Sequence, residues 1–355
     1  MSGNESNSLP IIDWSRGKNN PEDRVALAKS LRNICHEIGF FLVKNHGVDA
    51  SLVADAFSLS KQFFDLPLDK KKLIDKTQSR FFRGWEAEGA EYTNNRPDIR
   101  EQIDFWTDHV PYKESIEPHY LKLLGPNQWP SDELLPGFQV RIQAYIDALE
   151  KLANEIMATL AIGLELPEST FEDMFGDQRM SLLKLIRYPE TPVGEFGVNA
   201  HHDTGFLTVL HAGETPGLEV ELADGSWCEV PVIENTFVIN LGEMLQAITG
   251  NYFIATPHRV VTRSQRYSIG YFHGPGLNTP LHRLHLDKGF EKAVAASPRH
   301  LNAGFMAPIK ETLSGVGAME SPLQASTYGE QVWNYFCRSY PDNVRKYYPQ
   351  LVSSK

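Results

Sequence analysis

Cysteine is scarce in this sequence, and the few cysteines form no recognisable framework. The 355 residues contain only Cys35, Cys228 and Cys337, an odd number with no Cys-x-x-Cys pair. This argues against a disulfide scaffold and favours a reducing compartment. No apolar run approaches the ~18 residues that a membrane span requires, and the polar start, residues 1–10, lacks the pattern of a signal peptide. We therefore expect a soluble, cytoplasmic protein with no membrane partner.

Basic residues are in the minority. Lys and Arg number 34 against 45 Asp and Glu, which gives a formal net charge of −11, and no basic run or basic helix stands out. Such a balance repels phosphate backbones, so we expect no nucleic-acid partner. Hydrophobic residues make up 41% and charged residues 22% of the chain. These values are those of an ordinary globular protein and exclude general disorder and fibrous structure.

The sequence also lacks internal repeats, low-complexity tracts and a convincing linker, so we expect residues 1–355 to form one catalytic unit. Helical periodicity predicts helices at 21–38, 51–64, 138–164 and 329–340. From residue 181 the pattern changes to short β-rich segments at 181–188, 206–211, 218–221, 227–229, 237–240, 258–262 and 267–273. Many short strands separated by Gly, Pro and Asn are typical of a sandwich or barrel. The expected fold class is mainly β with flanking helices, and residues 80–95, which follow neither period, are expected to form a long ordered loop.

The histidines carry the first chemical signal. In the segment Asn199-Ala-His-His-Asp-Thr-Gly, a strand period of two places His201 and Asp203 on one face and His202 on the other. An imidazole and a carboxylate on one face can hold a divalent metal, but a bare His-x-Asp pair is common. The chain has a second such pair, His285 and Asp287, and for that pair a surface loop is the favoured interpretation.

Residues downstream distinguish the first pair from the second. His258 starts a predicted strand, and eight residues later Arg266 and Ser268 open the next one. Two His and one carboxylate without a thiolate form the facial set that suits Fe(II) and leaves coordination positions open. A buried Arg can grip a carboxylate through its fork of donors, and a Ser hydroxyl two residues on can add one more bond. The short step from His258 to Arg266 implies a tight hairpin.

These motifs resemble the Fe(II)- and 2-oxoglutarate-dependent dioxygenases, in the branch that includes isopenicillin N synthase, plant flavonoid oxidases and the bacterial ethylene-forming enzyme. The second half of the chain carries His201-x-Asp203-x-Gly205, Leu207-Thr208, Asn240 to Gln246, His258-Arg259-Val260 and Arg266-x-Ser268 in the family's order. The first half adds Pro10 to Asp13, Gly39-Phe40-Phe41, Asn45 to Val48 and Phe63 to Pro67. The similarity therefore runs nearly end to end.

The resemblance implies a double-stranded β-helix (jelly-roll) core, with a family-like N-terminal region at 1–120 and the jelly-roll region with the metal site at 181–285. It implies Fe(II) bound by His201, Asp203 and His258, and 2-oxoglutarate bound by Arg266, Ser268 and Tyr188, with O2 as the oxidant. The expected reaction couples decarboxylation of 2-oxoglutarate to hydroxylation or desaturation of a small molecule. Two alternatives stay open. One is an isopenicillin N synthase-like Fe(II) oxidase that does not use 2-oxoglutarate, which is favoured by the sequence Ile-Arg-Tyr-Pro around Tyr188. The other is a non-catalytic jelly-roll binding protein.

The substrate is addressed by three further residues. With a strand period of two, Lys184 shares a face with Tyr188, so it is expected either to point into the same cavity or to extend from the strand end to solvent. In the ethylene-forming enzyme the corresponding position is basic and meets the substrate's carboxylate, and Glu91 and Thr93 match that enzyme's substrate-loop pattern. The resemblance thus implies a small carboxylate-bearing substrate held by Lys184. Glu91 would meet a cationic or hydrogen-bond-donating group, and Thr93 would belong to the loop that covers the cavity.

Overall fold

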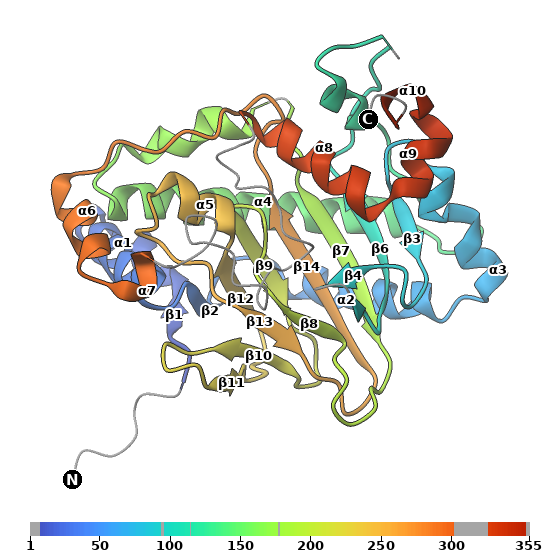
Figure 1. The fold of residues 1–355 in the computed structure, drawn as a ribbon. Helices are drawn as coiled ribbons and strands as arrows, with labels where there is room; N and C mark the ends of the chain where they lie inside the picture. The colour runs from blue at the N-terminus through green and yellow to red at the C-terminus, as the bar shows by residue number, and fades with distance from the viewer. Residues whose placement is uncertain (1–7, 94–95, 114, 177, 302–325, 353–355) are drawn as a thin grey trace.

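The computed structural model of the protein describes residues 8–93, 96–113, 115–176, 178–301 and 326–352. Two β-sheets face one another at its centre (Figure 1). The large sheet has the order β1-β2-β12-β9-β14-β7-β6-β3 and is antiparallel except for the β1–β2 pair. Its strands are β1 (Ile11–Asp13), β2 (Phe40–Lys44), β3 (Gly84–Glu86), β6 (Glu101–Trp106), β7 (Leu182–Tyr188), β9 (Leu207–His211), β12 (Thr236–Leu241) and β14 (Arg266–His273).

The small sheet has four antiparallel strands in the order β11-β10-β13-β8. They are β8 (Val198–His201), β10 (Leu218–Glu221), β11 (Trp227–Glu229) and β13 (His258–Val260). A two-stranded ribbon, β4 (Tyr92–Thr93) with β5 (Arg96–Pro97), lies outside both sheets. Because successive side chains of a strand point to opposite faces, each strand of the large sheet contributes to two layers of core.

β2 illustrates this division. Phe41 and Val43 belong to the large apolar core, whereas Phe40 and Leu42 belong to a smaller cluster that Val198, Leu218 and Val260 of the small sheet complete. The smaller cluster therefore fills the space between the two sheets. Two facing antiparallel sheets with an apolar filling confirm the expected jelly-roll core with flanking helices.

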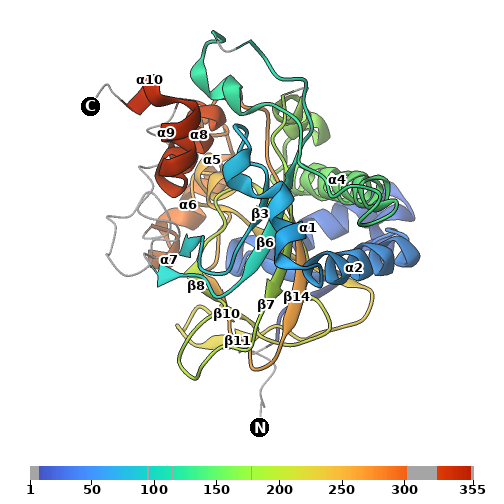
Figure 2. The same cartoon turned by 90° about the vertical axis from the view of Figure 1, so that its right-hand side faces the viewer.

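Helices cover the outer face of the large sheet. α1 (Pro21–Glu37), α2 (Ala50–Phe64) and α4 (Phe138–Gly163) lie together on that side, with α2 and α4 in contact with β14 (Figure 2). α1 starts with Pro21 in its first turn, where the Asn20 side chain accepts a hydrogen bond from the Asp23 amide. It ends before Gly39, whose φ of +64° and whose approach to the Ile254 carbonyl leave no space for a Cβ atom.

The remaining helices connect and close the structure. The α-helices are α3 (Leu68–Lys71), α5 (Glu243–Ile248), α6 (Lys288–Ala295), α7 (Pro298–Leu301), α8 (Tyr328–Ser339), α9 (Pro341–Tyr347) and α10 (Pro349–Val352). The 3-10 helices are η1 (Trp14–Lys18), η2 (Lys72–Ile74), η3 (Lys76–Gln78), η4 (His119–Leu123) and η5 (Glu168–Phe175). α8 lies on the opposite side of the large sheet from α4, above β6 and β7 (Figures 1 and 2). Among the helices described, none is both long and apolar enough to cross a membrane.

The predicted helices and the seven predicted strands are present, with ends that differ by one or two residues. Two expectations are wrong, and β6 was not anticipated at all. The stretch 80–95 contains β3 and β4 and is not simply a loop. The step from His258 to Arg266 is not a hairpin, because β13 and β14 belong to different sheets.

Candidate active site

Three potential metal ligands meet where the small sheet opens. His201 is the last residue of β8, Asp203 lies in the turn that follows, and His258 is the first residue of β13. Because β13 pairs with β8, His258 stands directly opposite His201. The prediction that one strand face presents both His201 and Asp203 is therefore wrong in its reason, since the strand ends at His201. The grouping itself is present: the ligand atoms of the three residues lie within 4.8 Å of one another.

Hydrogen bonds orient each of these side chains. The Nδ1 atom of His201 lies 2.8 Å from the Asn199 carbonyl oxygen, and that of His258 lies 3.2 Å from the Thr256 carbonyl oxygen. Both Nε2 atoms then point at Asp203 Oδ1, at 3.7 and 3.5 Å. Backbone carbonyls that hold Nδ1 in this way select the tautomer whose Nε2 can bind a metal.

Asp203 is held from its other oxygen. Oδ2 accepts hydrogen bonds from the Thr208 hydroxyl and, at 2.6 Å, from Asn240 Nδ2. Oδ1 is thereby left facing the two imidazoles. Thr208 and Asn240 stand opposite one another on the adjacent strands β9 and β12, so the sheet register fixes both donors.

The protonation states suit a cation. Burial and the neighbouring His258 lower the pKa of His201 to about 3. Burial alone would raise the pKa of Asp203, but the His258 and His201 rings outweigh it and hold that pKa well below its usual range. At neutral pH the site therefore offers a neutral imidazole at His201 beside an ionised carboxylate, which are the forms that metals bind.

The second His-x-Asp pair does not assemble a comparable site. Asp287 caps α6 by accepting a hydrogen bond from the Gly289 amide. His300 lies with Nδ1 2.6 Å from the Ser297 hydroxyl and Nε2 2.8 Å from the His36 carbonyl oxygen. Within the described part of the chain, the group at His201 is the one cluster of three or more ligands. His285 and Asp287 themselves lie exposed in the loop before α6, which agrees with the surface-loop interpretation.

Arg266 and Ser268 lie side by side on β14, both 1% exposed. Arg266 donates through Nη2 to the Ala212 carbonyl at 2.7 Å and through Nε to the Thr215 carbonyl at 3.2 Å. Its Nη1 atom and the Ser268 Oγ atom have no hydrogen-bond partner among the described residues. Tyr188 stands opposite Arg266 on β7, with its ring centre 5.2 Å from the guanidinium carbon. Two orphaned donors on one strand face are what an incoming carboxylate would satisfy.

A cavity of about 150 Å³ opens beside the three ligands. Residues of β6, β7 and β14 form its floor, and residues of α8 form its roof. Figure 1 shows where these elements lie. The lining residues are Glu91, Arg100, Asp104, Trp106, Met180, Leu182, Lys184, His201, His202, Asp203, Thr204, Gly205, Phe272, His273, Gly274, Tyr328, Gln331, Val332 and Tyr335. The lining thus combines potential metal ligands at one end with buried charges at the other.

Two of the three predicted substrate residues line this cavity. Lys184 is 6% exposed, so it points inward and does not reach solvent. Its Nζ atom lies 3.0 Å from Glu91 Oε2, so the two residues predicted to face opposite charges of a substrate are paired with one another. Thr93 is not among the lining residues. Its hydroxyl donates a hydrogen bond to Asp98 Oδ2 at 2.9 Å.

Sequence reasoning missed the buried charges around these residues. Lys76 Nζ contacts Asp104 Oδ2 at 2.7 Å and also contacts Glu86 Oε2. Arg100 Nη2 lies 2.7 Å from Glu91 Oε2 and 2.9 Å from Asp98 Oδ2. The available signal was the run Glu101-Gln-Ile-Asp-Phe-Trp, in which three polar residues and an isoleucine are followed by an aromatic pair. Nothing nearby in the sequence indicated the partners of the polar residues.

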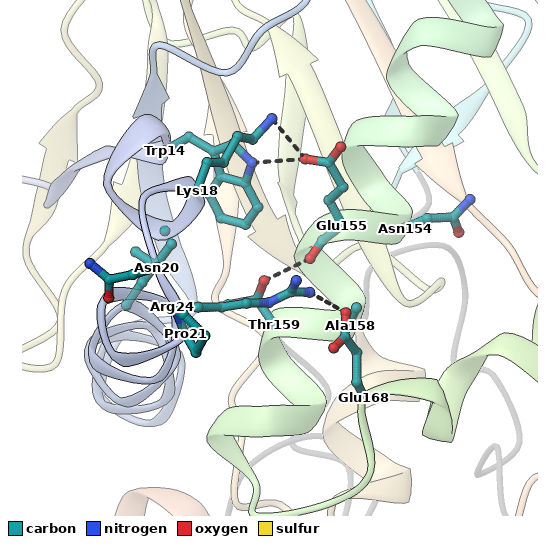
Figure 3. Close-up of a pocket in the computed structure, with 12 residues that line it drawn as sticks. Trp14, Lys18, Asn20, Pro21, Arg24, Asn154, Glu155, Ala158, Thr159 and Glu168 are labelled. Carbon is teal, nitrogen blue, oxygen red and sulfur yellow. Dashed lines mark hydrogen bonds and ion pairs between the residues drawn. The ribbon is translucent and has the colours of Figure 1, made fainter.

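A second groove lies between η1, α1 and α4 (Figure 3). The charged side chains that line it pair across it. Lys18 lies 3.2 Å from Glu155, which also accepts a hydrogen bond from Trp14, and Arg24 contacts Glu168. We therefore assign the candidate site to the cavity beside His201.

Comparisons with known proteins agree with this location. Residues 9–132 match the family described as the N-terminal part of non-haem dioxygenases in morphine synthesis, and residues 178–275 match the 2OG-Fe(II) oxygenase superfamily. The chain is 30% identical to a 2-oxoglutarate-dependent dioxygenase of Gibberella zeae, over 97% of this chain and 92% of that one. It is 32% identical to a homoarginine-6-hydroxylase of Oryza sativa subsp. japonica, over 76% and 87% respectively. The crystal structure of a full-length Neurospora crassa protein in complex with alpha-KG superposes with a TM-score of 0.72 at 23% identity, over 95% of this chain and 98% of that one, and therefore has the same fold.

Proposed function

Because the chain belongs to the 2OG-Fe(II) oxygenase superfamily, we propose that His201, Asp203 and His258 are its iron ligands. The enzyme couples the decarboxylation of 2-oxoglutarate to the oxidation of a small molecule by O2. The relatives support this function over an oxidase without 2-oxoglutarate and over a non-catalytic binding protein. The observation that carries the assignment to these residues is the convergence of three ligand atoms within 4.8 Å at the mouth of the cavity.

The residues present suit both Fe(II) and 2-oxoglutarate. Two imidazoles and a carboxylate, without a thiolate, form the donor set that favours Fe(II) and leaves positions open for a chelating acid and O2. We assign the distal carboxylate of 2-oxoglutarate to Arg266 Nη1 and Ser268 Oγ, which are buried without partners among the described residues, with Tyr188 beside them. Once bound, Fe(II) and its cosubstrate supply the oxidising chemistry.

The protein's own residues contribute binding and orientation. Thr208 and Asn240 hold Asp203 so that Oδ1 faces the two histidines. Tyr335 of α8 donates to Glu91 Oε1 at 3.1 Å, which ties the roof of the cavity to the strand-and-loop segment that carries Glu91.

We further propose that the substrate carries a carboxylate that Lys184 binds. Lys184 Nζ makes one hydrogen bond within the described residues, to Glu91, and an ammonium group has three donors. Glu91 has both oxygens engaged, so its proposed role is to hold Lys184 in place beside the substrate. Thr93 supports this segment through Asp98. Homoarginine, after which one relative is named, is a carboxylate-bearing molecule of this kind.

Two measurements test the proposed function. Anaerobic addition of 2-oxoglutarate to the Fe(II) protein should produce a visible charge-transfer band, and its absence would contradict the assignment of the cosubstrate. In a Lys184→Met variant, kcat/KM for acidic substrates should fall at least tenfold, whereas kcat/KM for the corresponding amides or esters should be unchanged. The exposed-lysine variant Lys61→Met is the control, and equal losses for acids and amides in Lys184→Met would remove the role of Lys184.

A further inference from the structure

Asp104 and Lys184 form a pair on the floor of the cavity. They stand directly opposite one another in the antiparallel register of β6 and β7, and Gly270 of β14 stands on the other side of Lys184. Directly opposed residues project from the same face of a sheet, and both Asp104 and Lys184 line the cavity. Because Gly270 has no side chain, the three residues aligned across β6, β7 and β14 present two side chains of opposite charge to the cavity.

Each member of this pair has hydrogen-bonding capacity to spare. Asp104 is 2% exposed, and its Oδ2 atom is bound by Lys76 at 2.7 Å. Its Oδ1 atom has no hydrogen-bond partner among the described residues, because the nearest cation, Lys184 Nζ, is 3.8 Å away. A buried carboxylate oxygen without a donor costs free energy, so a ligand that supplies a donor there is favoured.

Glu91 offers no comparable opening. Its Oε2 atom lies 2.7 Å from Arg100, 2.6 Å from Gln102 and 3.0 Å from Lys184, and its Oε1 atom accepts from Tyr335. Both oxygens of Glu91 therefore already accept hydrogen bonds. Of the two carboxylates that approach Lys184, Asp104 is the one with an oxygen that has no donor among the described residues, and it is the better placed to receive a ligand's cation.

The charges around the cavity also favour a cation. The ion-pair network that reaches the cavity through Asp104, Glu91, Arg100 and Lys184 has four carboxylates against three cationic side chains, a formal excess of one negative charge. Its residues are Glu86, Glu91, Asp98 and Asp104 with Lys76, Arg100 and Lys184. The pKa of Glu86 is raised, first by burial and then by the neighbouring carboxylates, against the effect of Lys76. A ligand that brings a carboxylate alone would add to this excess, whereas one that also brings an ammonium group would not.

We propose that Asp104 and Lys184 together bind the head group of an α-amino acid. Its ammonium group donates to Asp104 Oδ1, and its carboxylate accepts from Lys184 Nζ. The ammonium nitrogen and the carboxylate carbon of an α-amino acid are two bonds apart, which suits receptor atoms separated by 3.8 Å. This inference rests on the proposed binding of a substrate carboxylate by Lys184, and it extends that proposal by requiring an unblocked ammonium group.

The test uses matched ligands on the complete enzyme. Each proteinogenic L-amino acid is compared with its Nα-acetyl derivative, which keeps the carboxylate and loses the cation, and with its methyl ester, which does the reverse. The readouts are the rise in Tm of the anaerobic Fe(II)–2-oxoglutarate protein and the release of succinate in air. We expect at least one free amino acid to score in both readouts and its acetyl derivative to be at least tenfold weaker in kcat/KM.

Variants then locate the contact. Asp104→Asn should reduce the preference for the free over the acetylated amino acid at least tenfold. Glu86→Gln is the matched control, because it removes a carboxylate from the same charged group without altering the lining of the cavity, and it should keep the preference.

Three results would overturn the proposal: no amino acid that binds or is oxidised, an acetyl derivative as good as the free acid in the wild type, or Glu86→Gln behaving like Asp104→Asn. The second result requires no variant, so a folding defect in Asp104→Asn does not prevent the test. If the methyl esters lost activity and the acetyl derivatives kept it, the proposed contact between the substrate carboxylate and Lys184 would stand. The proposed contact between the ammonium group and Asp104 would be refuted. Loss of the charge-transfer band with 2-oxoglutarate would instead contradict the proposed function.

Discussion

The two ends of the cavity satisfy their polar groups in different ways. At the metal end, Asp203 Oδ1 faces two imidazoles beyond hydrogen-bonding distance, and Arg266 Nη1 and Ser268 Oγ have no partner among the described residues. At the β6 end, Lys76 and Glu91 are bound on every side. Unpaired buried groups are costly, so the atoms without a partner at the metal end mark a place where ligands enter. At the β6 end, Lys76 and Glu91 form a paired support, and Asp104 Oδ1 beside them is one of the atoms without a hydrogen-bond partner among the described residues.

The largest expected effect concerns the metal end. His201→Ala, Asp203→Ala and His258→Ala should each abolish 2-oxoglutarate-dependent turnover and stoichiometric iron binding, because three facial ligands act as one unit. The protein should stay folded, since the interior of both sheets is unchanged. Iron content and succinate release check this, with His285→Ala from the second His-x-Asp pair as the control. Wild-type activity with full iron content in any of the three variants would remove that residue from the metal site.

The second prediction breaks the support at the other end. Lys76→Met leaves Glu86, Asp104 and the Tyr340 hydroxyl without their buried cation. Removing one partner of a buried ion pair should lower the free energy of unfolding by about 3–5 kcal/mol, measured by urea denaturation. Lys70→Met, which removes the exposed pair with Asp69, should cost less than about 1 kcal/mol. Equal effects of the two substitutions would mean that the buried charges contribute little.

The third prediction compares two arginines of the large sheet, one proposed to bind 2-oxoglutarate and one that pairs with a glutamate. Arg266→Met should weaken 2-oxoglutarate binding by about 2–3 kcal/mol, roughly 30- to 150-fold, through loss of a charge-assisted carboxylate contact. Arg187 on neighbouring β7 pairs with Glu101, at 2.8 Å, on the opposite strand face from Tyr188. Arg187→Met should therefore leave the cosubstrate Kd unchanged. Calorimetric titration of the anaerobic Fe(II) protein gives both values, and an unaltered Kd in Arg266→Met would refute its role.

The smallest expected effect lies at the roof of the cavity. Burial, the neighbouring Tyr340 and Glu91 hold the pKa of Tyr335 well above its usual range, so its hydroxyl remains a donor to Glu91. Tyr335→Phe removes this hydrogen bond, which contributes about 1 kcal/mol. The substitution should raise the KM for substrate severalfold without changing the Kd for 2-oxoglutarate. Tyr347→Phe, which removes an exposed hydrogen bond to the Thr77 carbonyl, is the control. A larger change in the Kd for 2-oxoglutarate than in the KM for substrate would contradict the assignment of Tyr335 to the substrate end of the cavity.

The same division explains what could be predicted. The metal end follows from short motifs, because His201, Asp203, His258 and Arg266 carry their chemistry in their residue types and spacing. β6 was missed because its polar residues are buried by partners distant in the sequence. Glu101 pairs with Lys71, 30 residues away, and Asp104 with Lys76, 28 residues away.

The position of Asp203 shows a further limit. Period-two reasoning placed it correctly beside His201, but the strand ends at His201, two residues before Asp203, so that reason does not apply. The grouping arises instead from the β8–β13 pairing, which sets His258 opposite His201, and from donors on β9 and β12. Local spacing therefore identified the proposed ligands, whereas their arrangement depends on register between strands that are far apart in the chain.

The place of α8 in the chain has a consequence for biosynthesis. A ribosome delivers residues from the N-terminus onward, so the proposed iron and 2-oxoglutarate residues, which end at Ser268, are made before Tyr335. Tyr335 is hydrogen-bonded to Glu91 across 244 positions of sequence. The roof of the cavity is thus the last part of the site to be synthesised, and the proposed metal and cosubstrate residues are made before the helix that covers them.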